Sequence, residues 1–158
     1  MKTLSAPLSI CLAITNKCNL SCKHCLAASS QKNQDLTTEE LFSIIRQIKE
    51  LKIFDVSIFG GEPLLREDFF EVLEAFSVSK IVVGLNTNGT LITKDTARRL
   101  SGSSIRGYTV SLDGSKESVQ DPFRGEGSFK KNIEGIRNLA DIGANITIST
   151  IITKYNFN

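Results

Sequence analysis

Three cysteines lie within a stretch of eight residues, with the spacing C-x3-C-x2-C at Cys18, Cys22 and Cys25. A loop with this spacing can bring three soft thiolates close together, and thiolates are the ligands of iron–sulfur clusters. Three thiolates leave one iron of a [4Fe–4S] cluster without a protein ligand, and an open coordination position makes a metal centre reactive. The triad therefore predicts a [4Fe–4S] cluster whose fourth iron takes its ligand from elsewhere.

The same cysteines allow a second kind of metal site. A zinc site needs His24 or a distant group as its fourth ligand, but His24 adjoins Cys25 and zinc sites commonly use two C-x2-C pairs, so the cluster is favoured. Cys11 lies among apolar residues in a run that predicts a buried strand, and we expect it to be a small buried side chain. Four cysteines, three of them clustered, do not make the disulfide framework of a secreted domain.

The composition is that of a globular domain with little net charge. The 158 residues fit one domain, and 41% of them are hydrophobic, which is enough for a core. Lys and Arg number 19 against 17 Asp and Glu, and a dispersed net charge of +2 argues against nucleic acid or a membrane surface as a partner. Residues 1–14 lack the features of a signal peptide, and no stretch is apolar enough to span a membrane. We therefore expect a cytoplasmic protein.

Short apolar runs alternate with helix-forming stretches along the chain. Thr37 to Glu40 offers an N-cap followed by acidic residues, and Ser128 is expected to cap the last helix. A polar loop is expected from Leu112 to Gly125. The predicted strands are 9–15, 55–59, 80–85, 107–111 and 145–153, and the predicted helices are about 38–51, 66–76, 93–100 and 128–140. This alternation predicts an α/β fold with a parallel sheet and right-handed crossovers.

The polar and glycine-rich motifs all follow predicted strands. They are the cysteine loop, Gly60-Gly61-Glu62-Pro63, Asn86-Thr87-Asn88-Gly89 and Leu112-Asp113-Gly114. Because parallel α/β architectures bind ligands at the carboxyl ends of their strands, we expect these motifs to converge on one face. The two glycines allow close backbone approach, where N–H and C=O groups can hold an amino group or a carboxylate. On residue type alone, Glu62 is more often a surface acid.

In this order the motifs resemble those of the radical S-adenosylmethionine (radical SAM) enzyme superfamily. The cysteine motif after the first strand and the 60–63 turn after the second carry the resemblance. The segments 86–89, 111–114, Arg124-Gly125 and 127–129 resemble the peptide- and protein-modifying branch, which has a SPASM-type C-terminal extension. The resemblance runs from about residue 9 to the end of the sequence. It implies a partial (βα) barrel that is open and has about five βα units.

The resemblance also implies an activity. The three cysteines would hold three irons of the cluster, and the amino and carboxylate groups of S-adenosyl-L-methionine would chelate the fourth. An electron from the reduced cluster then cleaves this cofactor to methionine and a 5′-deoxyadenosyl radical, which abstracts a hydrogen atom from the substrate. The implied enzyme is an oxidoreductase-type maturase of a peptide or protein side chain. Its partner would be an external one-electron donor of the flavodoxin or ferredoxin type.

The cofactor-binding residues implied by the resemblance are His24, Gly60, Gly61, Glu62, Asn86, Ser111, Asp113 and Arg124. Backbone groups of residues 60–62 would contact the methionine amino group. His24 would lie near the adenine, Ser111 near the ribose or carboxylate, and Arg124 would pair with the carboxylate, which a guanidinium matches in shape. Three of these residues have an alternative interpretation. Arg124 could be a loop arginine in water, His24 could face the solvent, and Asp113 could form a turn before glycine.

Two departures from the family pattern limit these expectations. Gln120-Asp121 stands where relatives often carry a His-Asp pair, so no role is transferred to Gln120. One cysteine lies outside the triad, so this sequence cannot build an auxiliary cluster.

Residues 1–158 are expected to form the N-terminal part of a radical SAM core domain, without the sixth strand or a C-terminal auxiliary-cluster domain. A truncated, non-catalytic fragment is the second hypothesis and a zinc-binding module the third. No catalytic acid or base is assigned, because nothing ranks the acids that follow the strands.

Overall fold

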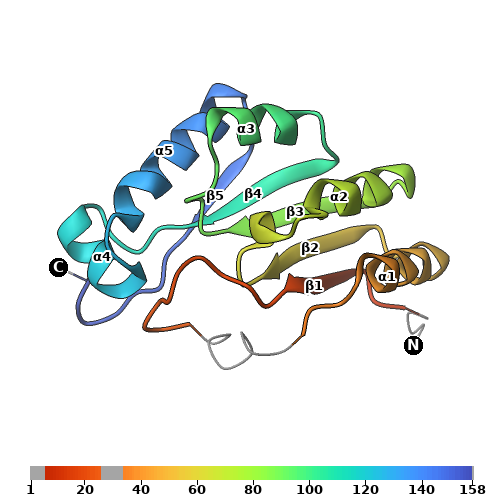
Figure 1. Cartoon of the computed structure of the whole chain (residues 1–158), viewed down its shortest axis with the longest axis horizontal. Helices are drawn as coiled ribbons and strands as arrows, with labels where there is room; N and C mark the ends of the chain where they lie inside the picture. Colours follow the sequence, from red (N-terminus) through yellow and green to blue (C-terminus); the bar gives the residue numbers. More distant parts are fainter. Residues whose placement is uncertain (1–5, 26–33, 158) are drawn as a thin grey trace, which may run out of the picture.

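The computed structural model describes residues 6–25 and 34–157. They contain a five-stranded parallel sheet in which the strands follow the order of the chain (Figure 1). The strands are β1 (Ser9–Thr15), β2 (Asp55–Gly60), β3 (Val82–Thr87), β4 (Ile105–Ser111) and β5 (Ile146–Ser149). The helices are α1 (Thr38–Glu50), α2 (Phe69–Val78), α3 (Lys94–Ser101), α4 (Glu117–Arg124) and α5 (Ser128–Asp141), with a short 3-10 helix η2 (Pro63–Leu65). The predicted α/β fold with a parallel sheet is confirmed.

The core lies between the sheet and a layer of helices. In Figure 1, α1, α2, α3 and α5 lie on one side of the sheet, while α4 lies near the end at which the strands finish. Side chains of a strand point alternately to the two faces, and the buried hydrophobic ones of the central strands are Val56, Ile58, Val83, Leu85, Tyr108 and Val110. The helices contribute Leu41, Ile45, Ile48, Phe69, Val72, Leu73, Phe76, Ala97, Leu100 and Leu139. Within residues 6–25 and 34–157, helices therefore cover one face of the sheet, and no helix covers the other, which we call the open face.

The open face overturns the expectation for Cys11. Cys11 is exposed, whereas its neighbours Ile10 and Leu12 on β1 pack against the core. An apolar run predicts burial on both faces only if both faces of the sheet are covered. Because the described helices cover one face, the prediction of a buried Cys11 is wrong.

Helix α4 occupies a segment that was expected to be a polar loop. Its two buried residues, Gln120 and Arg124, are polar and stand four positions apart, so they share one face of the helix. Pro122 also lies inside the helix. Apolar periodicity cannot detect a helix whose buried face is polar, and the prediction of a loop is therefore wrong.

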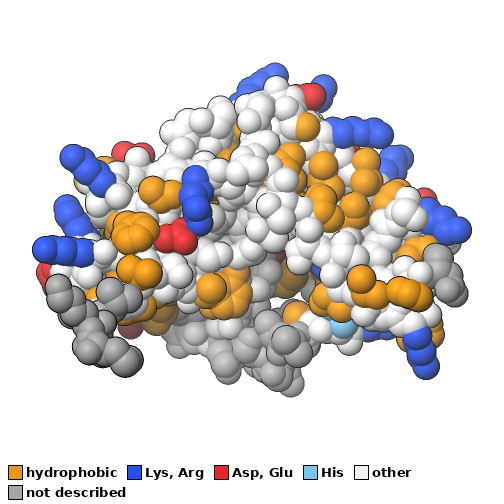
Figure 2. All heavy atoms as spheres, turned by 180° about the vertical axis from the view of Figure 1, so that it is seen from behind, with side chains coloured by type: hydrophobic (Ala, Val, Ile, Leu, Met, Phe, Trp, Pro, Cys, Tyr) orange, Lys and Arg blue, Asp and Glu red, His pale blue; other side chains and the backbone are white. Residues whose placement is uncertain are grey.

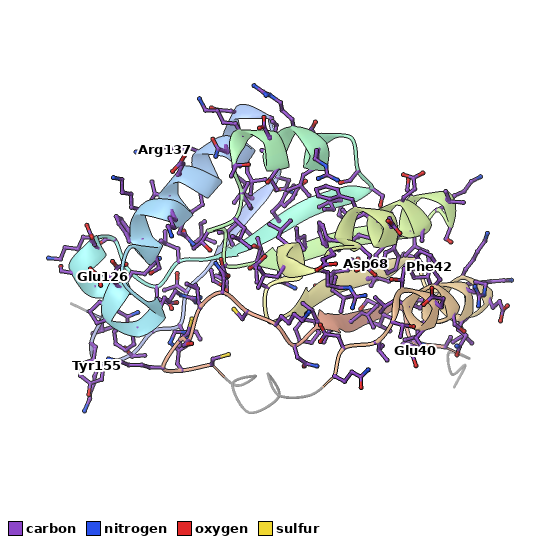
Figure 3. All side chains as sticks on the ribbon, in the orientation of Figure 1. Glu40, Phe42, Asp68, Glu126, Arg137 and Tyr155 are labelled. Atoms are coloured by element: carbon purple, nitrogen blue, oxygen red, sulfur yellow. The ribbon has the colours of Figure 1, made fainter. Side chains whose placement is uncertain are left out.

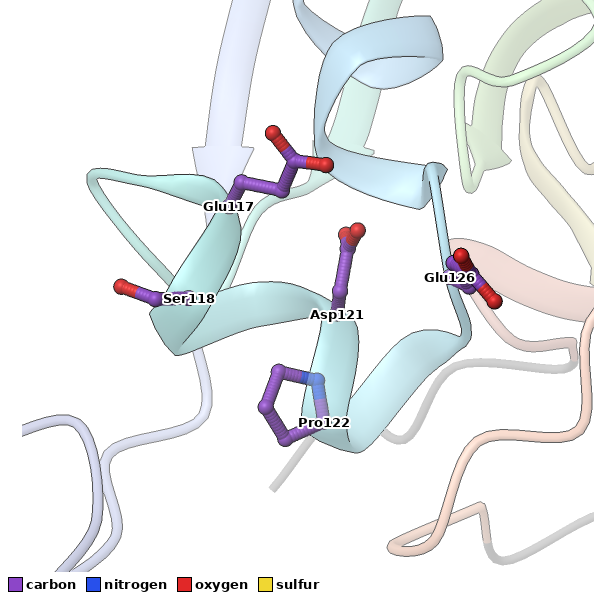
Figure 4. Close-up of a pocket in the computed structure, with 5 residues that line it drawn as sticks. All are labelled: Glu117, Ser118, Asp121, Pro122 and Glu126. Carbon is purple, nitrogen blue, oxygen red and sulfur yellow. The ribbon is translucent and has the colours of Figure 1, made fainter.

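A residue of α4 caps the start of α5. Ser128 is the first helical residue and not the cap, because Gly127 takes the N-cap position with a φ of 71°. The carboxylate of Asp121 accepts hydrogen bonds from the Gly127 N–H at 2.6 Å and the Phe129 N–H at 2.9 Å, and from the Ser128 hydroxyl at 3.0 Å. Figure 4 shows this carboxylate directed toward the first turn of α5. Asp121 thus supplies the acceptor that N-cap side chains usually provide.

The ends of two other elements test the local predictions. Thr37 caps α1 as expected: its hydroxyl accepts from the Glu40 N–H at 3.2 Å, and the Glu40 carboxylate accepts from the Thr37 N–H at 2.8 Å. Strand β5 is shorter than predicted and ends at Ser149. Beyond it, the Ile151 N–H donates to the Asp113 carboxylate at 2.9 Å in place of a strand partner.

The surface carries scattered charge. On the face seen in Figure 2, Lys and Arg side chains are spread along the outline, and hydrophobic side chains are exposed in several places between them. Across residues 6–25 and 34–157, no helix has the length and hydropathy needed to cross a membrane.

Candidate functional site

A cavity of about 510 Å³ opens at the carboxyl ends of the strands. Its wall is made by the cysteine loop, the ends of β2, β3 and β4, Arg124 of α4, and residues from β5 onward. Nine of the eleven predicted site residues line it, namely Cys18, Cys22, His24, Cys25, Gly60, Gly61, Asn86, Ser111 and Arg124. The other two, Glu62 and Asp113, are buried behind the wall. Parallel strands bring these residues together because all the motifs follow strand ends.

The three thiols of the triad are partly buried in one wall of the cavity. The loop that carries them is held by the Lys23 N–H, which donates to the Phe123 carbonyl of α4 at 2.8 Å. Within the described ranges, no three His, Cys, Asp or Glu side chains are placed to hold a metal ion. In a four-iron cluster each thiolate binds a different iron, so the sulfurs must surround a shared space and need not meet at one point. The donor set and the adjoining cavity fit that requirement.

Two thiols of the triad, those of Cys18 and Cys22, lie in an environment that favours protonation. Burial raises the pKa of the Cys18 and Cys22 thiols. The charge of Arg124 opposes this effect at Cys22, and hydrogen bonds from the Leu20 N–H and, to a smaller extent, from Asn88 oppose it at Cys18. Because iron binds the thiolate, metal binding at this loop must release protons.

The glycine turn after β2 packs directly against the base of the cysteine loop. The Gly61 N–H donates to the Thr15 carbonyl at 2.8 Å, and the Glu62 N–H donates to the Lys17 carbonyl at 2.7 Å. A Cβ on Gly60 would collide with the Thr15 carbonyl oxygen, and one on Gly61 would collide with that of Lys17. Glycine is required here because two backbones touch. Because the Gly61 and Glu62 N–H groups already have partners, they are not free to bind a ligand.

Glu62 is fully buried, so its interpretation as a surface acid is wrong. Its carboxylate accepts hydrogen bonds from the Thr87 hydroxyl at 2.8 Å, the Asn88 N–H at 2.8 Å and, more weakly, the Leu64 N–H at 3.3 Å. Burial raises the pKa of Glu62 to about 7, against the lowering effect of these hydrogen bonds. The side chain joins the end of β2 to the end of β3 behind the cavity wall.

Behind the cavity wall, Asp113 connects three segments: the cysteine loop, helix α4 and the residues after β5. Its Oδ2 atom accepts from the Arg124 Nε–H at 2.6 Å and lies 3.3 Å from the His24 Nε2 atom. Its Oδ1 atom accepts from the Ile151 N–H at 2.9 Å. Arg124 is therefore a buried, paired cation and not a loop arginine in water. Among the described residues, the buried Nδ1 atom of His24 has no hydrogen-bond partner.

Asn86 and Ser111 lie on the open face at the ends of β3 and β4. The Asn86 amide donates to the Ser57 hydroxyl at 2.8 Å, and Ser111 also lines the cavity.

The sequence does not predict two further residues at or next to the cavity, Asn88 and Asn132. Asn88 is 8% exposed and lines the cavity, and Asn132 of α5 donates to the Asn88 and Ser111 carbonyls. Asn88 lay within a motif already singled out, whereas a buried asparagine on a helix has no sequence signal of its own.

Arg66 clamps the two ends of the segment that carries the cysteines. One terminal nitrogen of its guanidinium donates to the Ile14 carbonyl at 2.7 Å and to the Leu36 carbonyl at 3.0 Å. Asp68 holds the same guanidinium at 2.6 Å and accepts from the Thr38 hydroxyl of α1 at 2.6 Å. Figure 3 shows Asp68 between α1 and the start of α2. This clamp fixes the base of the loop from outside the cavity.

Comparisons with known proteins agree with this architecture. A family model for the radical SAM superfamily matches residues 12–158. Mycofactocin maturase MftC of Mycobacterium tuberculosis is 37% identical over 155 residues, which are 97% of this chain and 40% of MftC. The AdoMet-dependent heme synthase of Methanosarcina barkeri is 34% identical over 155 residues, covering 96% of this chain and 44% of that enzyme.

A solved structure matches over nearly the whole chain. Streptococcus suis SuiB bound to S-adenosylmethionine is 27% identical, with a TM-score of 0.81 over 95% of this chain and 34% of SuiB. SuiB bound to its precursor peptide SuiA gives a TM-score of 0.84. The chain thus spans about two fifths of the length of the curated relatives named above. The matched region includes the cysteine triad and every strand end that lines the cavity. The chain belongs to the radical SAM superfamily, whose cofactors are a [4Fe–4S] cluster and S-adenosylmethionine.

Proposed function

We propose that Cys18, Cys22 and Cys25 hold the [4Fe–4S] cluster and that the cavity beside them binds S-adenosylmethionine for reductive cleavage. The observation that carries the proposal is that the three thiols, the glycine turn and Arg124 all face one cavity at the strand ends. Bound together, the two cofactors supply a 5′-deoxyadenosyl radical for hydrogen abstraction. The residues of this chain bind and orient the cofactors and exclude water from them.

Arg124 receives the carboxylate of the methionine moiety in this proposal. Its Nε–H is held by Asp113 at 2.6 Å, which fixes the plane of the guanidinium while Arg124 lines the cavity. A planar guanidinium binds a carboxylate through two parallel N–H groups, so a fixed plane sets the direction from which the carboxylate binds. Asp113 is therefore a positioning residue, whereas Arg124 touches the cofactor.

The glycine turn and the open face of the sheet serve the remaining groups of S-adenosylmethionine. The methionine ammonium is a donor, and the turn at Gly60 and Gly61 has carbonyl oxygens to accept from it. Asn86 and Ser111 provide polar side chains for the ribose, and His24 provides an aromatic ring for the adenine. All of these residues line the same cavity as the thiols.

Anaerobic reconstitution of the chain tests the proposal. We expect about four irons and four sulfides per chain, and reductive cleavage of S-adenosylmethionine to 5′-deoxyadenosine. Cys22→Ala should lose both. Cys11→Ala is the matched control, because Cys11 lines the same cavity outside the triad and its loss should leave cluster content unchanged. A Cys22→Ala protein that kept the cluster and the cleavage would contradict the proposal.

We further propose a peptide or protein side chain as the substrate. The support is the likeness to the maturase MftC and to SuiB, which has been solved with its precursor peptide. The heme synthase relatives make a tetrapyrrole the competing class. Because bound substrate promotes productive cleavage, the yield of 5′-deoxyadenosine can be compared with short peptides and with iron coproporphyrin. A rise with the porphyrin alone would contradict a peptide substrate.

The cluster needs an external electron, and we propose a small flavodoxin or ferredoxin as its donor. Reduced flavodoxin should support the cleavage of S-adenosylmethionine in place of a chemical reductant such as dithionite.

The non-catalytic fragment remains the second candidate because the chain covers 40% of MftC. Cleavage that appears only when the chain is extended to the length of its relatives would favour this candidate, and stoichiometric zinc without iron would favour a zinc module.

A further inference from the structure

We propose that Asn88 donates an N–H···S hydrogen bond to Cys18 and thereby raises the reduction potential of the cluster. The inference rests on the proposed function, because it requires Cys18 to be a cluster ligand. Asn88 directly follows β3 and is 8% exposed, so its side chain is largely shielded from water. It would act from outside the ligand set, through the sulfur atom of one ligand.

The amide of Asn88 faces the cysteine loop with both of its hydrogens. Its Nδ2 atom lies 3.9 Å from the Cys18 sulfur and 2.9 Å from the Asn19 Oδ1 atom. Sulfur is larger than oxygen and accepts hydrogen bonds over longer distances, so the two contacts can coexist. One N–H group thus points at a ligand atom and the other ties down the loop.

The surrounding network fixes which way the amide points. Its Oδ1 atom accepts from the Thr90 N–H at 2.9 Å and the Thr90 hydroxyl at 2.6 Å, so a flipped amide would face these donors with its own NH2 group. The backbone of Asn88 is held as well. Its N–H donates to the Glu62 carboxylate at 2.8 Å, and its carbonyl accepts from Asn132. Every polar group of Asn88 therefore has a hydrogen-bond partner. Together these partners keep the amide N–H directed at Cys18.

A fixed donor next to a ligand sulfur has a definite effect on reduction. Reduction adds negative charge to the cluster and its sulfur ligands, and an N–H group aimed at sulfur stabilises the more negative state. This hydrogen bond has a stronger effect where the site is shielded from water and the local dielectric constant is low. Loss of the donor should therefore make the cluster harder to reduce.

Redox titration of the reconstituted full chain, followed by electron paramagnetic resonance of the reduced cluster, tests this. In Asn88→Ala we expect the ratio of reduced to oxidised cluster at a fixed potential to be about tenfold lower, which corresponds to a fall of about 59 mV for a one-electron couple. Asn19→Ala is the matched control, since it removes the tether between the loop and Asn88 and leaves the donor to Cys18 in place. Its potential should match that of the unmodified chain.

Asn88→Asp is a second variant that controls for loss of structure in Asn88→Ala. Aspartate has the same shape and keeps an acceptor for Thr90, but it removes the N–H donor and adds a negative charge, so the potential should fall further here than in Asn88→Ala. Unchanged potentials in both variants, an equal fall in Asn19→Ala, or loss of the cluster from both Asn88 variants would each overturn the inference. Absence of a cluster from the unmodified chain would overturn the proposed function, and this inference with it.

Discussion

Two buried carboxylates stand at the same edge of the sheet and are held in opposite ways. Glu62 follows β2, is 0% exposed and accepts hydrogen bonds from neutral donors of Thr87 and Asn88. Asp113 follows β4, is 4% exposed and pairs with the buried guanidinium of Arg124. Burial without a cation raises the pKa of Glu62 to about 7. One carboxylate thus fastens two turns of the cavity wall, and the other anchors a cation that faces the cavity.

The largest effect is expected from removing the charge of Asp113. Asp113→Asn keeps the shape of the side chain but leaves Arg124 as a buried cation without its counter-charge. Breaking a buried pair from one side costs about 4 kcal/mol, because the remaining charge stays desolvated. Urea unfolding of the apo chain measures the loss in the free energy of unfolding.

An exposed ion pair provides the control for Asp113. Asp95 and Arg98 pair at 2.8 Å, but their side chains are 86% and 73% exposed. Exposed pairs contribute about 0 to 1 kcal/mol, so Asp95→Asn should cost little. Equal losses in the two variants would show that the burial of Asp113 does not decide its contribution.

The raised pKa of Glu62 predicts a pH dependence of the stability. The pKa of Glu62 rises from 4.5 to about 7 on folding, so between these values the native chain holds a proton that the unfolded chain has released. The free energy of unfolding should then fall as pH rises through this window, by on the order of 3 kcal/mol, and level off above it. Glu62→Gln, which is neutral throughout, should lack this fall. Urea unfolding at pH 5 and pH 8.5 measures the difference.

A variant of an exposed carboxylate is the control for the change in the free energy of unfolding between pH 5 and pH 8.5. Glu74 on α2 is exposed, and Glu74→Gln should keep the full fall in stability of the unmodified chain. If Glu62→Gln shows the same fall as Glu74→Gln, then Glu62 does not hold a proton in the folded chain near neutral pH.

The contrast between the two carboxylates also marks what the sequence can predict. The triad, the glycine turn and the strand-end motifs were located because parallel strands place their carboxyl ends at one edge. Gly60 and Gly61 were interpreted as sites of close backbone approach, and the structure shows that two carbonyl oxygens exclude a Cβ there. Such steric requirements act on single positions and leave a signal in the residue type.

What escaped prediction depends on which surfaces become buried. Glu62, Gln120 and Arg124 are polar residues inside the molecule, and nothing in their neighbours along the chain distinguishes them from surface residues. Helix α4 was missed for this reason. Cys11 was placed in the core because its strand is apolar, whereas its exposure depends on which face of the sheet the helices cover. These properties arise from tertiary packing and not from local pattern.

A smaller effect is expected from a methyl group on the glycine turn at the Glu62 end. Gly61→Ala pushes a Cβ into the Lys17 carbonyl, and backbone cannot move aside as a flexible side chain can. Overpacking of this kind costs about 2 to 3 kcal/mol, and the shift should also lower the affinity for S-adenosylmethionine. Gly102→Ala is the control, because its Cβ would meet its nearest neighbour at 4.0 Å. Urea unfolding and equilibrium dialysis of the reconstituted chain measure the two effects, and equal stability of the variants would contradict the steric argument.

The smallest effect concerns one of the neutral donors that hold Glu62. Thr87→Val keeps the shape of the buried side chain and removes the hydroxyl that donates to Glu62 at 2.8 Å and accepts from the Gly89 N–H at 3.0 Å. A hydrogen bond to a charged carboxylate contributes about 2 kcal/mol, and one to a neutral carboxyl group about 1 kcal/mol. Because Glu62 is ionised at pH 8.5 and protonated at pH 5, the variant should lose about 1 kcal/mol more stability at the higher pH, whereas the lost bond to Gly89 costs the same at both. A loss that does not change with pH would mean that Thr87 stabilises the turn through packing and its bond with Gly89, and that the charge of Glu62 is held by the Asn88 and Leu64 N–H groups.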